Sequence, residues 1–159
     1  RVRLFGGEAF EGYLSVAPQS PVREGPETLL ELLNTPVRVV PFLLASDETV
    51  MLLTRQYLNS VEPGPEANLE TVSPPHYLVT REELVAVEWL DGHRAEGRVP
   101  MELPRDLNRA SDYLNGGDDF FPLITLEGTQ LVNKLRLRSV RIFSAAPRPA
   151  AVEIPFKAA

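Results

Sequence analysis

Three segments of the chain repeat one pattern, and this repetition constrains the fold more than any other feature of the sequence. Segments 52–61, 78–87 and 131–140 each begin with two apolar residues, a small polar residue and a cation, and end with Leu and Val three positions apart. Side chains on one face of a continuous strand lie two positions apart, so a step of three predicts a bulge or a tight turn. We therefore expect each copy to form a strand, a turn and a bent strand.

Two longer blocks surround these segments and occur in the same order along the chain. Residues 4–14 match residues 89–99, and residues 29–42 match residues 109–123. The identical positions are Gly7 and Gly92, Glu11 and Glu96, Gly12 and Gly97, Leu33-Asn34 and Leu114-Asn115, and Pro41 and Pro122. Matches in several blocks that keep one order indicate an internal duplication.

Each repeat predicts the same series of elements. Gly6-Gly7 and Asp91-Gly92 are tight-turn signals between apolar strands, because Gly tolerates the positive φ that hairpin turns need. A Pro-rich connection then leads into one short helix, over residues 27–34 in the first repeat and 107–115 in the second. Both helices end at Asn, which favours the conformation of a helix C-cap.

A strand follows each helix. Residues 37–45 and 120–126 are dense in β-branched and aromatic side chains, which is typical of buried strands. Pro41 and Pro122 lie inside these strands and have no N–H to donate. We therefore expect each proline at a bulge or beside an unpaired edge.

The chain divides into a first β-barrel repeat at residues 1–63, a Pro-rich linker at 64–76, a second β-barrel repeat at 77–143 and an extended or disordered tail at 144–159. The predicted fold is mostly β, with two tandem related small β-barrels that each carry one short helix between the second and third strands. A unit of about 60 residues buries too little surface to be stable alone, so the repeats should pack together or oligomerise. Separate barrels and one shared core both remain open.

The second repeat resembles the SH3/Sm-like small β-barrels, a group that includes the bacterial RNA chaperone Hfq. The resemblance rests on Asp91-Gly92, Glu96-Gly97 and segment 131–140. In the Sm-like family the last motif is strand four, a 3-10 turn and strand five, and its polar and cationic residues help to line the RNA pocket of a ring. The resemblance implies this role for Asn133 and Lys134, and in the other copies for Thr54, Arg55, Thr80 and Arg81.

Two features depart from that family. The helix lies between the second and third strands rather than before the first, and Leu135 follows Lys134 where Hfq has a lysine–histidine pair. The series "DYLN … FPL … VNK", within residues 112–134, also resembles uncharacterised bacterial proteins built from tandem copies of such a unit. That second resemblance implies no activity.

The strongest basic cluster lies in the last copy of the repeated pattern. Lys134, Arg136 and Arg138 alternate with leucines, so a strand would place the three cations on one face, where successive phosphates could bind. A solvated outer face with charges that protect an edge explains the same pattern. The chain has 16 basic and 22 acidic residues, for a net charge of −6, and phosphate backbones are repelled by such a protein at long range. Nucleic-acid binding is therefore disfavoured, although it stays open.

The sequence predicts no metal site. Cys is absent, and His76 and His93 stand alone, without further ligands at short spacing. A group of acids near the Gly-Gly turn lacks the alternating order of a calcium-binding loop. These acids are Asp112, Asp118, Asp119 and Glu127.

The sequence also predicts no enzyme and no cofactor. The nucleophile elbow, the phosphate-binding loop and the dinucleotide fingerprint are all absent. Glu11 and Glu96 could form a carboxylate pair for acid–base chemistry. Their shared position before Gly fits a β-bulge or a turn better.

These observations predict a non-catalytic protein-interaction or assembly module that uses its sheet edges and the groove between the barrels. Its partner is another protein or a second copy of the chain. The alternative is a single-stranded RNA-binding protein that uses Lys134, Arg136 and Arg138, and a third reading is a carboxylate-dependent hydrolase at Glu11 and Glu96.

The expected location is the cytoplasm, without contact with a membrane. No apolar run approaches the ~20 residues of a membrane span, and no basic start followed by an apolar core indicates a signal peptide. The first residue is Arg1 rather than Met, so what precedes it stays open.

Overall fold

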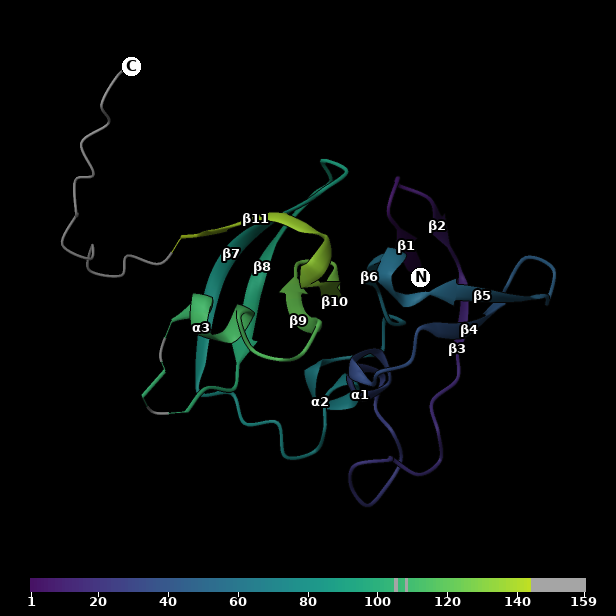
Figure 1. Ribbon diagram of the computed structural model, residues 1–159, viewed down its shortest axis with the longest axis horizontal. Coiled ribbons are helices and arrows are strands. Elements are labelled where there is room, and N and C mark those ends of the chain that lie inside the picture. Colours follow the sequence, from purple (N-terminus) through teal and green to yellow (C-terminus); the bar gives the residue numbers. More distant parts are fainter. Residues whose placement is uncertain (105, 108, 144–159) are drawn as a thin grey trace.

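The described chain is mostly β, and its strands form two open sheets. The computed structural model describes residues 1–104, 106–107 and 109–143. Within this part, eight strands form one sheet, three strands form the other, and three short α-helices lie between strands (Figure 1). The mostly β class is confirmed. Neither sheet is closed, so the arrangement as two small barrels stays a prediction.

The strands of each sheet have a spatial order that differs from their order along the chain. The large sheet has the order β11 (Leu137–Ile142), β7 (Arg81–Trp89), β8 (Arg94–Met101), β9 (Phe120–Thr125), β10 (Gly128–Asn133), β6 (Leu58–Val61), β1 (Val2–Leu4) and β2 (Ala9–Phe10). The small sheet has the order β3 (Gly12–Leu14), β4 (Val39–Leu44) and β5 (Val50–Thr54). The helices are α1 (Leu29–Asn34), α2 (Leu69–Val72) and α3 (Ala110–Leu114), and the 3-10 turns are η1 (Arg55–Tyr57) and η2 (Lys134–Arg136).

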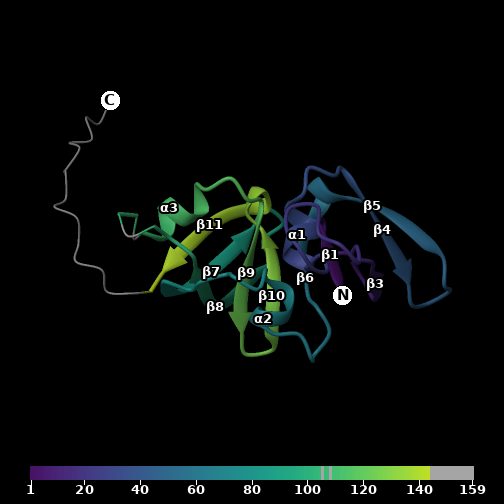
Figure 2. The same ribbon diagram turned by 90° about the horizontal axis from the view of Figure 1, so that it is seen from below.

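The large sheet joins the two halves of the chain. Strands β1, β2 and β6 come from the first half, and β7 to β11 come from the second. The two groups meet where β6 pairs antiparallel with β10, with Leu131 opposite Val61 and Val132 opposite Ser60. Both views show two lobes side by side that meet at this pair of strands (Figures 1 and 2).

Each lobe has its own buried apolar cluster. The first contains Val2, Leu30, Leu33, Phe42, Leu53, Leu58, Val61, Val72, Phe120 and Leu131. The second contains Val85, Val87, Trp89, Val99, Met101, Leu103, Ala110, Phe121, Leu123 and Val132. Successive residues of a strand point to opposite faces, so Phe120 and Leu131 enter the first cluster while Phe121 and Val132 enter the second. The β9–β10 hairpin therefore supplies side chains to both cores.

Two of the three copies of the repeated pattern fold as predicted. Strand, 3-10 turn and strand follow one another in residues 52–61 (β5, η1, β6) and in residues 131–140 (β10, η2, β11). The turn predicted within residues 78–87 is wrong, because β7 runs through this segment with an unbroken register against β8. Glu83 and Val85 are buried two positions apart, and this period of two needs no turn.

The predicted hairpin turns are confirmed, with positive φ at Gly6, Gly7 and Gly92. Gly12 and Gly97 have a different role. A Cβ at Gly12 would collide with the carbonyl oxygen of Leu43 in β4, and one at Gly97 would collide with that of Ile124 in β9. These glycines allow the second strand of each half to pass close to the strand that follows the helix.

The prediction that Glu11 and Glu96 lie at a β-bulge or a turn is right for Glu11 only. Glu11 lies between β2 and β3, where the chain passes from the large sheet to the small one. Glu96 lies inside β8, where the pairing with β7 runs without a bulge.

Pro41 and Pro122 lie inside β4 and β9, as predicted. The pairing of β3 with β4 starts at Phe42, and the pairing of β8 with β9 is at Ile124. Pro41 therefore has no partner residue in β3, and Pro122 has none in β8. On that side of each strand, the missing N–H of proline costs little.

The helices are shorter than predicted. Thr28 caps α1 and Glu31 completes a capping box, so the helix begins at Leu29 rather than at residue 27. The second predicted helix is α3, at Ala110–Leu114. The predicted linker contains a helix that was not foreseen, α2, whose Val72 is buried in the first cluster.

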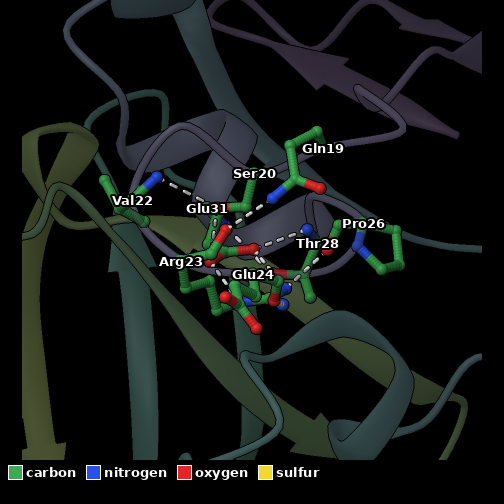
Figure 3. Close-up of polar contacts among 8 residues, drawn as sticks. All are labelled: Gln19, Ser20, Val22, Arg23, Glu24, Pro26, Thr28 and Glu31. Carbon is green, nitrogen blue, oxygen red and sulfur yellow. Dashed lines mark hydrogen bonds and ion pairs between the residues drawn. The ribbon is translucent and has the colours of Figure 1, made fainter.

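The loop before α1 folds around one ion pair (Figure 3). Arg23 donates from Nε to Glu31 Oε1 at 2.7 Å and from Nη2 to Oε2 at 2.8 Å, and it also donates to the carbonyl oxygens of Glu24 and Pro26. Burial raises the pKa of Glu31, but the hydrogen bonds from Arg23 and Thr28 outweigh it and leave the pKa below its ordinary value. The loop is therefore ordered by a paired carboxylate.

No helix of the described residues is long and apolar enough to cross a membrane. The predicted tail at residues 144–159 lies outside the described residues.

Candidate interaction site at the junction and the sheet edges

The junction between the halves brings together most of the residues that the repeated pattern singled out. Turn η1 ends the β5 strand and turn η2 ends the β10 strand, and the two turns are in contact beside the β6–β10 pair. Thr54 is the last residue of β5, and Asn133 is the last residue of β10. We call the paired strands β6 and β10, together with the turns η1 and η2, the junction.

Asn133 links the two halves through its side chain. It is 1% exposed; its Nδ2 donates to the carbonyl oxygen of Leu58 at 2.9 Å, and its Oδ1 accepts from the backbone N–H of Leu135 at 3.0 Å. The first bond crosses the junction, and the second holds turn η2. A buried amide with both ends satisfied is a structural cross-link rather than a free ligand group.

Arg55 and Asn34 make a second polar connection across the junction. Arg55 donates to the carbonyl oxygen of Leu33 at 2.9 Å, near the end of α1, and forms an ion pair with Asp119 at 3.0 Å. Asn34 accepts from the backbone N–H of Phe120 at 2.8 Å and donates to its carbonyl oxygen at 3.0 Å. The end of α1 is thereby fixed against the start of β9.

Trp89 makes the third connection. Its indole N–H donates to the carbonyl oxygen of Asn59 at 3.0 Å, and the Asn59 side chain donates to Asp91 at 2.6 Å. Trp89 and Asn59 are both fully buried. Trp89 thus belongs to the core of the second half and bonds across the junction.

Arg136 makes the fourth connection, and it binds the first half rather than solvent. Its Nε donates to the carbonyl oxygen of Gln56 in η1. The guanidinium lies over the rings of Phe5 at 5.1 Å and Tyr57 at 5.2 Å. Stacking of this kind favours Arg over Lys at the position.

The predicted face of three aligned cations does not form. Lys134 and Arg136 lie in turn η2, whereas Arg138 lies in β11, because the chain turns where a straight strand was expected. Lys134 donates to the carbonyl oxygen of Gly116, and Arg138 lies 3.6 Å from a carboxylate oxygen of Glu88. The three cations thus have three separate partners.

Thr80 and Arg81 lie away from the junction, at the opposite end of β7 from Trp89. Thr80 Oγ1 accepts from the backbone N–H of Leu103 at 3.0 Å, and Arg81 Nε donates to Glu83 at 2.6 Å. Both residues serve the local structure at the start of β7, which has no turn. The structure does not bring them together with the other two copies of the pattern.

A hollow of about 250 Å³ lies between α3 and the start of β9. Two of the acids considered as metal ligands, Asp112 and Asp118, line it together with Lys134. Nearby, the hydroxyls of Tyr77 and Tyr113 are hydrogen-bonded at 2.8 Å. Burial raises the pKa of both tyrosines above its ordinary value, so these phenols stay protonated and act as hydrogen-bonding groups.

The outer edges of the two sheets are unpaired within the described part of the chain. Strand β5 ends the small sheet, and β11 ends the large sheet next to β7. Val50 and Leu52 on β5 and Ile142 on β11 are exposed. Unpaired strands with exposed apolar side chains are templates for another chain.

Sequence reasoning assigned no role at the junction to four residues that bond across it: Asn34, Asn59, Asp91 and Asp119. Asn59 had no clear signal, because β6 has the half-polar sequence Leu-Asn-Ser-Val and the burial of all four residues is visible only in the structure. A buried polar residue needs a specific partner, and the partner of Asn59 could not be read from the sequence either.

Among the described residues, no group of three or more His, Cys, Asp or Glu could hold a metal ion. Comparison with known protein families, with curated proteins and with solved structures finds no match to the chain.

Proposed function

We propose that the protein is a non-catalytic interaction and assembly module, built from two tandem related small β-barrels of the SH3/Sm-like kind. It binds protein through its open strand edges. The observation that carries this proposal is that β5 and β11, one terminal strand of each sheet, have an unpaired outer edge within the described part of the chain and carry exposed apolar side chains.

The strand pairings support the duplication. The first half has the pairs β1–β2, β3–β4, β4–β5 and β1–β6. The second half has β7–β8, β8–β9, β9–β10 and β7–β11. If β2 and β3 are two parts of one strand, the pairs correspond one to one, and α1 and α3 hold the same place between the second and third strands. The repeated glycines, Gly12 and Gly97, also make equivalent close approaches.

The contacts of the polar pattern residues favour a structural role for them. Asn133, Arg55 and Arg136 form bonds across the junction, so their side chains are engaged within the chain. No specific observation favours RNA binding over this role. The exposed apolar edges are the groups that remain for a partner.

Edge-dependent capture of protein from cells tests the proposal. The immobilised chain should retain one or more proteins, and Leu52→Lys on β5 or Ser139→Lys on β11 should abolish that retention by placing a charge on one edge. Val22→Lys, in the exposed loop before α1, is the matched control and should retain them unchanged. Retention that survives both edge substitutions would contradict the proposal.

A further inference from the structure

We propose that the protein associates head to tail, with the β5 edge of one copy pairing with the β11 edge of the next. This inference rests on the proposed function, and it names the partner as a second copy of the chain. The new interface would repeat the β6–β10 junction, because β5 holds in the first half the place that β10 holds in the second, and β11 corresponds to β6.

At the junction, apolar side chains of the second half enter the core of the first half. We call the entering side chains, Phe120 and Leu131, the plug, and the residues of the first half that receive them the socket. Leu33, Leu58 and Val61 of the first half belong to one buried cluster with Phe120 and Leu131 of the second half. Phe120 is 1% exposed and Leu131 is fully buried. Two apolar side chains of the second half therefore complete the core of the first.

The corresponding socket of the second half is empty within the described part of the chain. By the sequence match, Leu114, Leu137 and Val140 are the equivalents of Leu33, Leu58 and Val61. They line an open hollow of about 310 Å³ beside β11. By the same match, this hollow corresponds to the place in the first half that Leu131 fills.

The corresponding plug of the first half is exposed. Val39 and Leu52 are the equivalents of Phe120 and Leu131, and they are 44% and 67% exposed. One molecule thus presents an unfilled socket at one end and an unburied plug at the other. A second copy provides the missing part in each case.

The residue types at the edges fit the register of the junction. There, Leu131 faces Val61 and Val132 faces Ser60. The same register between copies places Leu52 opposite Val140 and Leu53 opposite Ser139 of the next copy. Each new pair keeps an apolar residue opposite Val or Ser, so the edges can pair without placing a charge at these two positions.

The polar contacts distinguish the new interface from the junction. Asn115, which is exposed, is the equivalent of Asn34 and can bind the backbone of Val39 in the neighbouring copy as Asn34 binds Phe120. The ion pair between Arg55 and Asp119 has no counterpart, because its equivalents, Lys134 and Arg38, are both cations. We therefore expect the interface to be weaker than the junction and to strengthen as salt screens the two charges.

The two edges are different surfaces, so the contact is heterologous. Such a contact produces a closed ring if the rotation between copies closes and a filament if it does not. A symmetric dimer, in which β5 pairs with β5, would leave the socket beside β11 empty.

Sedimentation velocity of the full chain, over a wide range of protein concentration, tests the inference. The wild type should sediment as species larger than 17.7 kDa. Leu52→Lys and Ser139→Lys should each weaken the association at least about tenfold, because the equivalent residues of the junction, Leu131 and Ser60, are buried and a charge there would lose its water. Val22→Lys should associate like the wild type. Circular dichroism spectra should match for all variants, since the three residues are exposed in the single chain.

Mixing the two edge variants identifies the head-to-tail arrangement. Ser139→Lys keeps an intact β5 edge and Leu52→Lys keeps an intact β11 edge, so the mixture should form a dimer with one intact interface and stop there. Arg38→Asp should tighten the association of the otherwise native chain severalfold, because it creates the missing partner for Lys134.

A wild type that remains monomeric at every concentration, or a mixture that does not dimerise, would overturn the inference. In that event, capture of a different protein that is lost in both edge variants would still support the proposed function. Loss of both results would reject the interaction module as well.

Discussion

Gly97 lies in β8 where the backbone of β9 passes too close for a side chain. A Cβ there would meet the carbonyl oxygen and carbonyl carbon of Ile124, and backbone atoms cannot move aside as the end of a flexible side chain can. Gly97→Ala should therefore lower the free energy of unfolding by about 1 to 3 kcal/mol, as overpacking does. Urea denaturation measures the change.

Gly64→Ala is the matched control, because nothing lies within 4 Å of a Cβ at Gly64 and its φ is not in the left-handed region. Its free energy of unfolding should stay the same or rise slightly, since Ala restricts the unfolded chain. An equal loss of stability in both variants would show that the close approach of β8 to β9 is not what excludes a side chain.

Glu31 makes the loop before α1 dependent on pH. Its pKa in the folded chain is below the ordinary value of 4.5, so its stabilising effect is complete above pH 4.5 and is lost as the pH falls through the folded pKa. Glu31→Gln should lower the free energy of unfolding at neutral pH, by about 1.5 to 3 kcal/mol for a hydrogen-bonded charge. The difference between wild type and variant should shrink in acid.

Urea denaturation from neutral to acidic pH measures this difference. Glu66→Gln gives the comparison, because Glu66 is exposed in the loop before α2 and its side chain bonds no other described residue. A difference between wild type and Glu31→Gln that persists unchanged in acid would contradict the role of the paired carboxylate.

At the scale of elements, what the sequence predicted well was local. The hairpin turns depend on Gly6, Gly7 and Gly92, and their positive φ follows from the residue type. The 3-10 turn of residues 131–140 was predicted from the spacing of their apolar residues. This spacing is an ambiguous signal, because β7 has the same spacing and is a straight strand.

The junction could not be predicted from the sequence, because it depends on which strand edges meet. Asn34 has the sequence of a helix end, and its bonds to Phe120 exist only because α1 packs against β9. Arg136 likewise looks like a solvated cation until η1 and η2 come into contact and place Phe5 and Tyr57 beneath it. Long-range pairing of this kind leaves no periodic signal in the residues that make it.

Turn η2 also determines whether the basic residues of segment 134–138 can bind RNA. With Lys134, Arg136 and Arg138 bound to separate partners, this segment presents no row of cations that could follow a phosphate backbone. Fluorescence anisotropy with a mixed single-stranded RNA pool should show no binding, even at low salt. Binding that weakens as salt rises, and that is lost in the Lys134→Ala/Arg138→Ala variant but kept in Arg94→Ala, would instead support RNA recognition.

At the scale of the whole molecule, the two halves depend on each other for a complete core. Phe120 and Leu131 are buried in the cluster of the first half, and Trp89 is buried with its indole bonded to Asn59 across the junction. Fragment 1–63 would lose three buried side chains of its cluster, Val72 of α2 as well as Phe120 and Leu131, and would expose the cavity they leave. Fragment 77–143 would expose Phe120 and Leu131 to water and leave the indole N–H without its partner.

We therefore expect each fragment alone to be unfolded, because large-to-small changes at single core positions already cost about 2 to 5 kcal/mol and a domain is stable by about 5 to 15 kcal/mol. Circular dichroism and amide hydrogen exchange measure this directly. Co-expressed fragments should recover protected amides in β6 and β10, since the junction is formed by strand pairing that needs no covalent link. Independent folding of either fragment would mean that the shared sheet joins two self-sufficient units, and the junction would then be an interface between domains rather than part of one core.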